Sequence, residues 1–482
     1  MTDLDPRLNS APENVAHIHI MGICGTAMAA LAGMLLQSGY IISGSDRQVY
    51  PPMSDFLAQL GIPVCNGYGP ENLTPRPDLV IVGNVITRSN PEAVALAEAG
   101  IPYLSLPQAL AHFYIRSLTS LVVAGTHGKT TTSSLLASAL FRAGFDPSFM
   151  IGGIVREFAG NFRIGAGRYF VAEGDEYDTA FFDKGSKFLH YQPKIAILTS
   201  IEFDHADIFA DLDAIKRTFR KFVALIPEDG LLVACLDDPN VAEIAAEARC
   251  PVQGYGLNRS LEWSLDDVRI ERGITHFTAW RSGEKWAELS VRLPGRHNCL
   301  NSLAVTAVLQ HIGLGSEAIN EGLHTFGGVK RRQEIRGIEG GVTVIDDFAH
   351  HPTAVRETLQ ALKAAYAGQR LIAVFEPRTN SSRRAIFQKD YVAAFAAADV
   401  VYLREPMALA NVAEGELFSS AQLAADIRLL QHLPAESFPD TDRLLSHLET
   451  VLQTGDIVAI LSNGGFDNIH VRLLELLKKR PN

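Results

Sequence analysis

Short apolar runs alternate with longer amphipathic segments along most of the chain, a pattern that predicts parallel β-sheets covered by helices. The first predicted strands lie at residues 15–21, 40–43, 79–82 and 102–104. A second series follows at 121–124, 169–172, 195–198 and 230–234. A third lies at 342–345, 371–375, 400–403 and 457–461. We therefore predict an α/β fold of three domains.

The predicted domain boundaries lie near residues 116 and 327. Residues 1–116 and 327–482 are expected to form Rossmann-like domains, because strands and helices alternate regularly in both. Residues 117–326 are expected to form a central P-loop ATPase-like domain with a mixed sheet. The length of 482 residues agrees with about three domains.

A glycine loop ending in Lys-Thr-Thr follows the apolar run at 121–124 and predicts a phosphate site. Lys129 can reach a β- or γ-phosphate, and the Thr130 hydroxyl can bind Mg²⁺. The common G-x-x-x-x-G-K motif would have its first glycine at Val123, so this loop is a shortened variant. The alternative is a βα turn that merely contains glycine. The predicted ATP-binding loop is Gly125, Thr126, His127, Gly128, Lys129, Thr130 and Thr131.

The amino-acid composition limits the possible binding partners and the cellular compartment. The formal charge of −11 offers no basic surface for nucleic acid, so we expect small-molecule phosphates. Five scattered cysteines without C-x-x-C spacing argue against a disulfide framework and a cysteine-based zinc site. A polar start and the absence of any run of ~18 apolar residues predict a cytoplasmic protein without a membrane partner. We expect a monomer or a weak homodimer.

A second glycine turn, Gly22 to Met28, lies between the first strand and the first helix. A nucleotide pyrophosphate would bind at such a place. The turn lacks the full G-x-G-x-x-G because Cys24 and Ala27 occupy two of the usual glycine positions. Asp46, at the end of the next strand, suits a nucleotide's ribose. A tight turn of small residues for helix packing is an equally good interpretation.

Acidic and polar clusters follow the central strands. Glu173, Asp175 and Glu176 come directly after an apolar strand and predict Mg²⁺ shared with phosphate, or else a solvated acidic turn. His205, after the next strand, is a candidate second metal ligand or an ordinary hydrogen-bonded histidine. Asn298 and Asn301 suit an adenine edge, but Asn298 equally suits a helix cap.

Polar loops also end the strands of the third series, at residues 346–352, 376–380 and 462–466, and a basic run precedes them at 330–332. Ligands bind at this edge of an open α/β sheet, so these loops can close over the central phosphate site. The alternatives are turn chemistry for the loops and a solvated face for the basic run.

With these motifs, the chain resembles the Mur ligase family, the ATP-dependent amide-forming enzymes of peptidoglycan assembly, over almost its full length. The motifs that occur in the family's order are residues 125–131, Glu173 to Glu176, Asp204-His205, His297-Asn298-x-x-Asn301, Arg331-Arg332 and 346–352. The resemblance implies ATP and two Mg²⁺ ions as cofactors. It also implies that the first domain binds a UDP-sugar and that the third binds the peptide or amine substrate and closes over ATP.

The resemblance further implies roles for individual residues. The UDP-sugar would contact Gly22, Ile23, Cys24, Gly25, Thr26, Ala27, Met28, Ser45, Asp46 and Asn84. The metal ions would bind Thr130, Glu173 and His205. ATP would also contact Asn298, Asn301 and Arg331, with Asp346 or Asp347 at its ribose. The catalytic set would be Lys129, Glu173, His205, Arg331 and His350, and the peptide would meet Arg378 and Asn463.

Within the family, the muramate-recognising members are most similar. We favour the member of peptidoglycan recycling that joins UDP-N-acetylmuramate to L-Ala-γ-D-Glu-meso-diaminopimelate through an acyl phosphate, with its place in cell-wall biogenesis, cell shape and cell division. Cys24 and the segments 180–191, 202–209, 376–378 and 462–466 carry this preference. The alternative is the alanine-adding member of primary peptidoglycan synthesis. A non-catalytic nucleotide sensor is a third hypothesis, which the many clustered acids oppose.

Overall fold

The N-terminal domain is a five-stranded parallel sheet with the strand order β3-β2-β1-β4-β5. In the computed structural model, residues 3–50, 53–407 and 414–480 are described. The strands are β1 (His17–Met21), β2 (Ile41–Asp46), β3 (Val64–Asn66), β4 (Leu79–Val82) and β5 (Tyr103–Ser105). The helices are α1 (Thr26–Gln37), α2 (Met53–Gln59), α3 (Pro91–Ala99) and α4 (Leu106–Phe113), and they form apolar cores on both faces of the sheet.

The central domain is built on a ten-stranded mixed sheet with the order β17-β16-β15-β14-β13-β12-β6-β9-β7-β8. Its middle strands are parallel, and antiparallel pairs extend both ends. The strands are β6 (Thr119–Ala124), β7 (Ser148–Val155), β8 (Gly160–Arg163), β9 (Tyr169–Gly174), β12 (Ile195–Leu198), β13 (Leu231–Cys235), β14 (Val252–Gly256), β15 (Trp263–Glu271), β16 (Ile274–Arg281) and β17 (Glu284–Val291), beside a small hairpin of β10 (Asp178–Ala180) and β11 (Asp183–Ser186). The helices are α5 (Lys129–Arg142), α6 (Leu212–Val223), α7 (Pro239–Ala245), α8 (Arg296–His311) and α9 (Ser316–His324).

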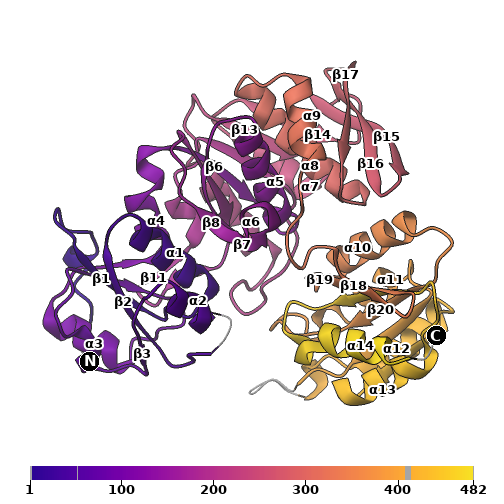
Figure 1. The fold of residues 1–482 in the computed structure, drawn as a ribbon. Helices are drawn as coiled ribbons and strands as arrows, with labels where there is room; N and C mark the ends of the chain where they lie inside the picture. The colour runs from indigo at the N-terminus through magenta and orange to yellow at the C-terminus, as the bar shows by residue number, and fades with distance from the viewer. Residues whose placement is uncertain (1–2, 51–52, 408–413, 481–482) are drawn as a thin grey trace.

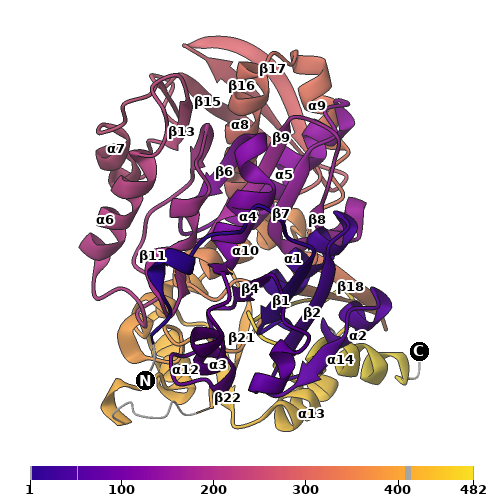
Figure 2. The same cartoon turned by 90° about the vertical axis from the view of Figure 1, so that its left-hand side faces the viewer.

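The C-terminal domain has a six-stranded sheet in the order β18-β19-β23-β20-β21-β22. All of its pairs are parallel except β18 with β19. The strands are β18 (Glu334–Glu339), β19 (Val342–Asp347), β20 (Leu371–Phe375), β21 (Val400–Arg404), β22 (Ala435–Phe438) and β23 (Ile457–Leu461). The helices are α10 (Pro352–Ala365), α11 (Asp390–Ala394), α12 (Ser420–Leu430), α13 (Thr441–Val451) and α14 (Ile469–Lys478). Figure 1 shows the three sheets as separate lobes, and Figure 2 shows them from the side.

The first two domains share one apolar core. Buried side chains of α1, α4 and β1 belong to the same cluster as those of β6, β9 and α6. Aromatic pairs cross the boundary, with ring centroids 4.8 Å apart for Tyr103 and Phe182 and 6.5 Å apart for Tyr114 and Phe170. The C-terminal domain instead has its own two clusters, one of which Phe203 of the central domain also contacts.

The predicted α/β fold with three parallel-rich sheets is confirmed, and the predicted strands at 79–82, 195–198, 371–375 and 457–461 match β4, β12, β20 and β23. The sequence pattern missed the antiparallel strands β8 and β15 to β18 and the β10–β11 hairpin, and also β3, β7, β14 and β22. The predicted boundaries at 116 and 327 stay predictions. In the described part of the chain, no helix combines the length and the apolar character needed to span a bilayer.

Candidate active site

A cavity of about 1310 Å³ is lined by residues of all three domains. The N-terminal domain contributes Thr26 and Ala27 at the start of α1, and the central domain contributes the loop before α5. From the C-terminal domain come His350 and His351, just before α10. Polar motifs at residues 126–131, 173–177, 202–205, 298–301 and 347–351 therefore meet in one space. The loops at 376–380 and 462–466 are not among the described residues that line it.

The loop between β6 and α5 has the shape of a phosphate-binding turn. Gly125 has φ +133° and Gly128 has φ +80°, values at which a side chain would be strained. A Cβ atom would also be crowded, at 2.2 Å from Thr199 Oγ1 for Gly125 and at 2.9 Å from Asn301 Oδ1 for Gly128. Glycine at both positions lets the loop turn tightly and aim the N-terminus of α5 into the cavity.

The Lys129 side chain lies across this loop. Its Nζ donates to the carbonyl of Gly125 at 2.6 Å and forms an ion pair with Glu176 at 2.9 Å. Burial alone would lower the pKa of Lys129, but the neighbouring carboxylates of Glu176 and Asp175 raise it above its ordinary value. The ammonium therefore stays charged where a phosphate would bind.

Thr130 and Glu173 form a pair of hard oxygen donors. Thr130 Oγ1 donates to Glu173 Oε1 at 2.8 Å, and the backbone N–H of Gly152 donates to Glu173 Oε2 at 2.7 Å. Glu173 reaches this place because β9 is the neighbour of β6 in the sheet. A hydroxyl and a carboxylate fixed together beside a phosphate loop suit Mg²⁺.

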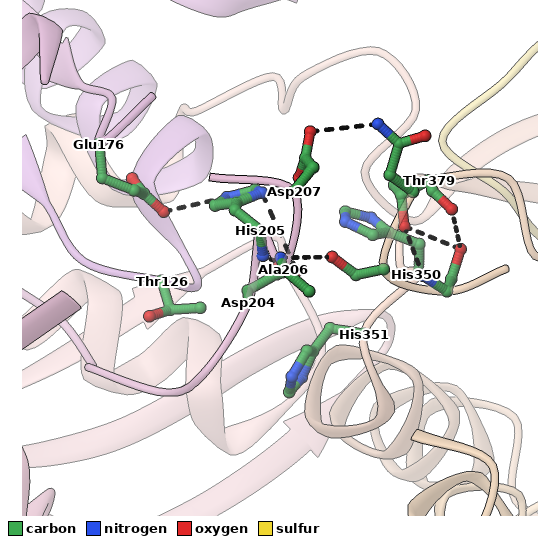
Figure 3. A network of polar contacts seen from close by, with 12 residues as sticks. Thr126, Glu176, Asp204, His205, Ala206, Asp207, His350, His351 and Thr379 are labelled. Atoms are coloured by element: carbon green, nitrogen blue, oxygen red, sulfur yellow. Dashed lines mark hydrogen bonds and ion pairs between the residues drawn. The ribbon is translucent and has the colours of Figure 1, made fainter. Parts of the chain in front are cut away.

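His205 is linked to Lys129 through Glu176, which contacts both side chains. Its Nε2 lies 3.2 Å from Glu176 Oε1, and Glu176 is 2% exposed. Burial acts to lower the pKa of His205, but the hydrogen bond to Glu176 and the charge of Asp204 raise it. Figure 3 shows His205 on a loop that has Glu176 on one side and His350 and Thr379 of the C-terminal domain on the other.

Asn298 and Asn301 lie together in the first turns of α8 and line the cavity. Asn301 Nδ2 contacts Asn298 Oδ1 at 3.4 Å, and Asn298 Nδ2 donates to the carbonyl of Pro294 at 2.7 Å. The helix cap is Gly295 and not Asn298, so that alternative interpretation is wrong. The neighbouring lining residues include Tyr255, Leu257 and Leu293, which give this end of the cavity an apolar wall.

The paired arginines point in different directions. Arg331 Nη2 donates to the carbonyls of Ser462 at 2.6 Å and Gly464 at 2.7 Å. Arg332 Nη2 instead donates to Thr130 Oγ1 at 3.2 Å, with its guanidinium 4.5 Å from the centre of the Phe348 ring. Arg332, rather than the predicted Arg331, therefore meets the phosphate loop in this arrangement.

The paired aspartates differ in a similar way. Among the described residues that line the cavity are Arg332 and Asp347, but not Arg331 or Asp346. Asp346 is 2% exposed and faces His470 at 3.2 Å and Arg336 at 3.3 Å. Successive side chains of a strand point to opposite faces of the sheet, so Asp346 and Asp347 of β19 cannot both face the cavity. Asp346 lies on the face turned away from it.

His350 and the two residues predicted to meet the peptide lie at the edge of the C-terminal sheet. His350 lines the cavity, its Nδ1 lies 3.0 Å from the carbonyl of Phe348, and burial lowers its pKa. Arg378 follows β20 and Asn463 follows β23, which are adjacent parallel strands. The Arg378 side chain is 42% exposed, and its stem packs on Gly464.

In the N-terminal domain, the Gly22 to Met28 turn is held by the end of β2. The backbone N–H of Gly22 donates to the carbonyl of Ser45 at 2.8 Å, and that of Cys24 donates to Asp46 Oδ2 at 2.9 Å. Gly25, Thr26 and Ala27 are exposed, whereas Ile23 and Met28 are buried in the core beneath. Asn84 is exposed in the loop after β4.

Several residues that line the cavity were absent from the predicted set, among them Lys187, Glu202 and Arg332. Arg332 was visible as a member of a charged motif, as was Glu176, which pairs with Lys129. Spacing alone could not decide which member of each motif faces inward. Lys187 follows the small hairpin and pairs with Asp175 at 2.6 Å, a contact without any sequence signal.

A shortened phosphate loop, a hydroxyl–carboxylate pair and a cavity shared by three α/β domains together define an enzyme that uses a nucleoside triphosphate. Comparison with known protein families narrows this class of enzyme further. Residues 17–117 match the Mur ligase family, catalytic domain, residues 123–309 the Mur ligase middle domain, and residues 331–464 the Mur ligase, glutamate ligase domain. The chain belongs to the Mur ligase family and is an ATP-dependent ligase that forms a carbon–nitrogen bond, which confirms the predicted family and enzyme class.

Full-length relatives refine the comparison. The UDP-N-acetylmuramate–L-alanyl-γ-D-glutamyl-meso-2,6-diaminoheptandioate ligase of Haemophilus influenzae is 40% identical over 463 residues, covering 96% of this chain and 99% of the relative. A UDP-N-acetylmuramate–L-alanine ligase of Geobacter sp. is 37% identical over 464 residues, covering 96% and 98%. The crystal structure of a murein peptide ligase from Psychrobacter arcticus has a TM-score of 0.71 and 35% identity, covering 97% of this chain and all of that one.

Proposed function

We propose that this chain joins the lactyl carboxylate of UDP-N-acetylmuramate to the amine of L-Ala-γ-D-Glu-meso-diaminopimelate, at the expense of ATP, in peptidoglycan recycling. The observation that carries the proposal is the cavity that runs from Thr26 and Ala27, past Lys129, to His350. It gives the sugar, the phosphates and the amine a common space. Identity over nearly full length to the tripeptide-adding ligase supports this choice of substrates.

The sugar nucleotide would bind at the start of α1. The exposed Gly25 to Ala27 segment offers backbone N–H groups to a diphosphate, and the Gly22 to Met28 turn, Ser45, Asp46 and Asn84 would contact the rest of the UDP moiety. Since Thr26 and Ala27 also line the cavity, a sugar attached to that diphosphate would extend toward the phosphate loop.

ATP would bind along residues 125–131, with its adenine beside Asn298 and Asn301 and its γ-phosphate near Lys129. An oxygen of the lactyl carboxylate attacks the γ-phosphorus, the bond to the ADP oxygen breaks, and an acyl phosphate forms. The amine then attacks the acyl carbon and phosphate leaves. Lys129 and Arg332 would neutralise the charge on the phosphoryl oxygens, with Arg331 holding the C-terminal loops and His350 positioning the reacting groups.

The donor set at the phosphate loop fits Mg²⁺. Thr130 and Glu173 would hold one ion, and Glu173 with His205 a second, because hydroxyl and carboxylate oxygens dominate the set. Bound there, the ions would reduce the charge repulsion between the phosphates and the attacking carboxylate.

The peptide would enter from the C-terminal domain. The exposed Arg378 guanidinium can pair with a peptide carboxylate through two hydrogen bonds, and Asn463 lies on the adjacent strand end. In the described residues, the buried Oδ1 atom of Asn463 has no hydrogen-bond partner, which leaves it free to accept from an incoming amide or ammonium. We further propose a cytoplasmic location, with which five free thiols agree, and a monomer or weak homodimer.

A product assay tests the proposal. The enzyme is given ATP, Mg²⁺ and UDP-N-acetylmuramate together with either the tripeptide or free L-alanine, and both phosphate release and the nucleotide-linked product are measured. We expect efficient turnover with the tripeptide. The alternative, supported by 37% identity to an alanine ligase, predicts turnover with L-alanine alone, and that result would refute our choice.

A further inference from the structure

Two histidines and one glutamate from separate parts of the chain converge beside the phosphate loop. His127 belongs to the loop, Glu202 follows β12, and His351 is the N-cap of α10 in the C-terminal domain. One possible ligand atom from each of the three side chains lies within 4.8 Å of the other two. This cluster has no part in the function proposed above, apart from the place of His127 in the loop.

Three polar groups surround a single oxygen of Glu202. Its Oε2 lies 3.2 Å from His127 Nε2, 3.5 Å from His351 Nδ1 and 2.7 Å from the Thr353 hydroxyl that donates to it. Because it accepts the Thr353 hydroxyl, this oxygen acts as a hydrogen-bond acceptor in the cluster.

His351 faces this carboxylate with an acceptor atom. Its Nε2 lies 3.2 Å from the carbonyl of Phe203, so that nitrogen carries the proton, and Nδ1 accepts from the Thr353 N–H at 3.3 Å. Nδ1 also lies 3.5 Å from Glu202 Oε2, so two acceptor atoms face each other. A cation bound to both atoms would take the place of the Thr353 N–H at Nδ1 and turn this contact into an attractive one.

We propose that His127, Glu202 and His351 bind one divalent transition-metal ion of the zinc type. Imidazole nitrogens with one carboxylate oxygen are ligands that Zn²⁺ and Co²⁺ favour, whereas Mg²⁺ prefers oxygen alone. Ligand atoms about 2.1 Å from a tetrahedral ion are about 3.4 Å apart. The two separations that involve Glu202 Oε2, 3.2 and 3.5 Å, match that spacing, and the two histidine nitrogens lie within 4.8 Å of each other.

The groups around the three ligands fit a metal site as well. Metal-binding histidines usually donate their second N–H to a carbonyl or carboxylate, which the Phe203 carbonyl provides for His351. Thr353 orients Glu202 in the same way. An ion here would link the phosphate loop of the central domain directly to the first turn of α10 in the C-terminal domain. The cysteine spacing gave no hint of it because its nitrogen ligands are histidines.

Zinc titration of the full-length protein tests the site. The chelator-treated protein is titrated with Zn²⁺ by calorimetry in excess Mg²⁺, which competes for the oxygen donors around Glu173. In a second titration Co²⁺ replaces Zn²⁺, and the visible absorption of the bound Co²⁺ reports nitrogen ligation. We expect one equivalent of Zn²⁺ in the wild type and loss of that equivalent in His351→Gln and in Glu202→Gln. Thr353→Val keeps all three ligands and should weaken binding by about 10- to 100-fold.

His205→Gln is the matched control, because it removes the other histidine–carboxylate pair of the cavity and should leave the zinc equivalent unchanged. Circular dichroism of each metal-free variant checks folding. If a ligand variant does not fold, the zinc affinity of Thr353→Val tests the proposal in its place. The proposal is overturned if the wild type binds no zinc in excess Mg²⁺. It is equally overturned if His205→Gln loses the ion while His351→Gln and Thr353→Val bind it as the wild type does.

Discussion

The hydroxyl of Thr130 donates to Glu173 at 2.8 Å and thereby joins the first turn of α5 to the end of β9. The Gly152 N–H fixes the other carboxylate oxygen at 2.7 Å. Both side chains are thus held in place by the protein itself, so little reorganisation is needed when a cation and phosphate bind between them.

Replacing Glu173 with glutamine should keep this shape and remove the charge. We expect kcat to fall by about 100-fold or more, with a higher Mg²⁺ concentration needed for half-maximal rate, because the developing phosphoryl charge loses its metal anchor. Steady-state rates over a Mg²⁺ series measure both effects. Glu243→Gln, which changes an exposed ion pair on α7, is the control. An unchanged Mg²⁺ dependence in Glu173→Gln would remove Glu173 from the metal site.

The two neighbouring arginines should respond differently to substitution by lysine. Arg332→Lys loses the fixed guanidinium that reaches Thr130, so we expect kcat to fall by about 100-fold. Arg331→Lys loses two bonds to the carbonyls of Ser462 and Gly464, so we expect mainly a raised KM for the peptide. Full kinetics of both variants separate the roles. A larger loss of kcat in Arg331→Lys would restore the assignment made from the sequence.

His297 should make the folded chain less stable in mild acid. Burial lowers its pKa to about 4, whereas histidine in an unfolded chain has a pKa of about 6.5. Between these values the unfolded chain binds more protons, so stability falls as the pH drops from about 6.5 to about 4. With 29% of the side chain exposed, we expect a loss of roughly 2 kcal/mol.

Thermal unfolding midpoints at about pH 7.5 and about pH 5 measure this effect. His297→Gln should narrow the difference between the two midpoints. His311→Gln, at the exposed end of the same helix α8, should leave it as in the wild type. If His297→Gln and the wild type lose the same stability in acid, the buried histidine is not the cause.

The C-terminal domain should move toward the other two when substrates bind. Among the described residues, its links to the central domain include single hydrogen bonds such as Ala206 N–H to Ser381 at 3.1 Å and Asn380 to Asp207 at 3.1 Å, rather than a continuous apolar core. We expect the radius of gyration from small-angle scattering to fall when an ATP analogue and UDP-N-acetylmuramate are added together. Identical scattering with and without both ligands would contradict domain closure.

The sequence was sufficient for the long apolar parallel strands and for the loops that follow them. Buried parallel strands such as β6 and β20 are continuous apolar runs, and the polar residues that follow them must lie at one sheet edge. Shorter or less apolar parallel strands such as β3 and β22 were not foreseen. The antiparallel strands β16 and β17 were missed as well, because only part of each faces the core.

Within each motif, the sequence did not show in which direction each side chain points. Arg331 and Arg332 are adjacent in sequence, yet the left-handed backbone at Arg331, with φ +60°, sends their side chains to different domains. Likewise, Asp346 and Asp347 lie on opposite faces of β19. Such choices depend on one or two torsion angles, and composition and spacing carry no information about them. Contacts between domains, such as that of Glu202 with His351 and Thr353, depend on the packing of whole domains.

The apolar core shared by the first two domains has a consequence for how such enzymes diverge. Residues that bury surface against one another are expected to change together, so we expect the first two domains, with the sugar and phosphate sites proposed for them, to be inherited as one unit. The last domain, with its own cores, is free to accumulate changes around Arg378 and Asn463 without disturbing that unit. Exchange of this domain alone, between relatives that add different amines, is therefore the simplest route by which a new peptide specificity can arise.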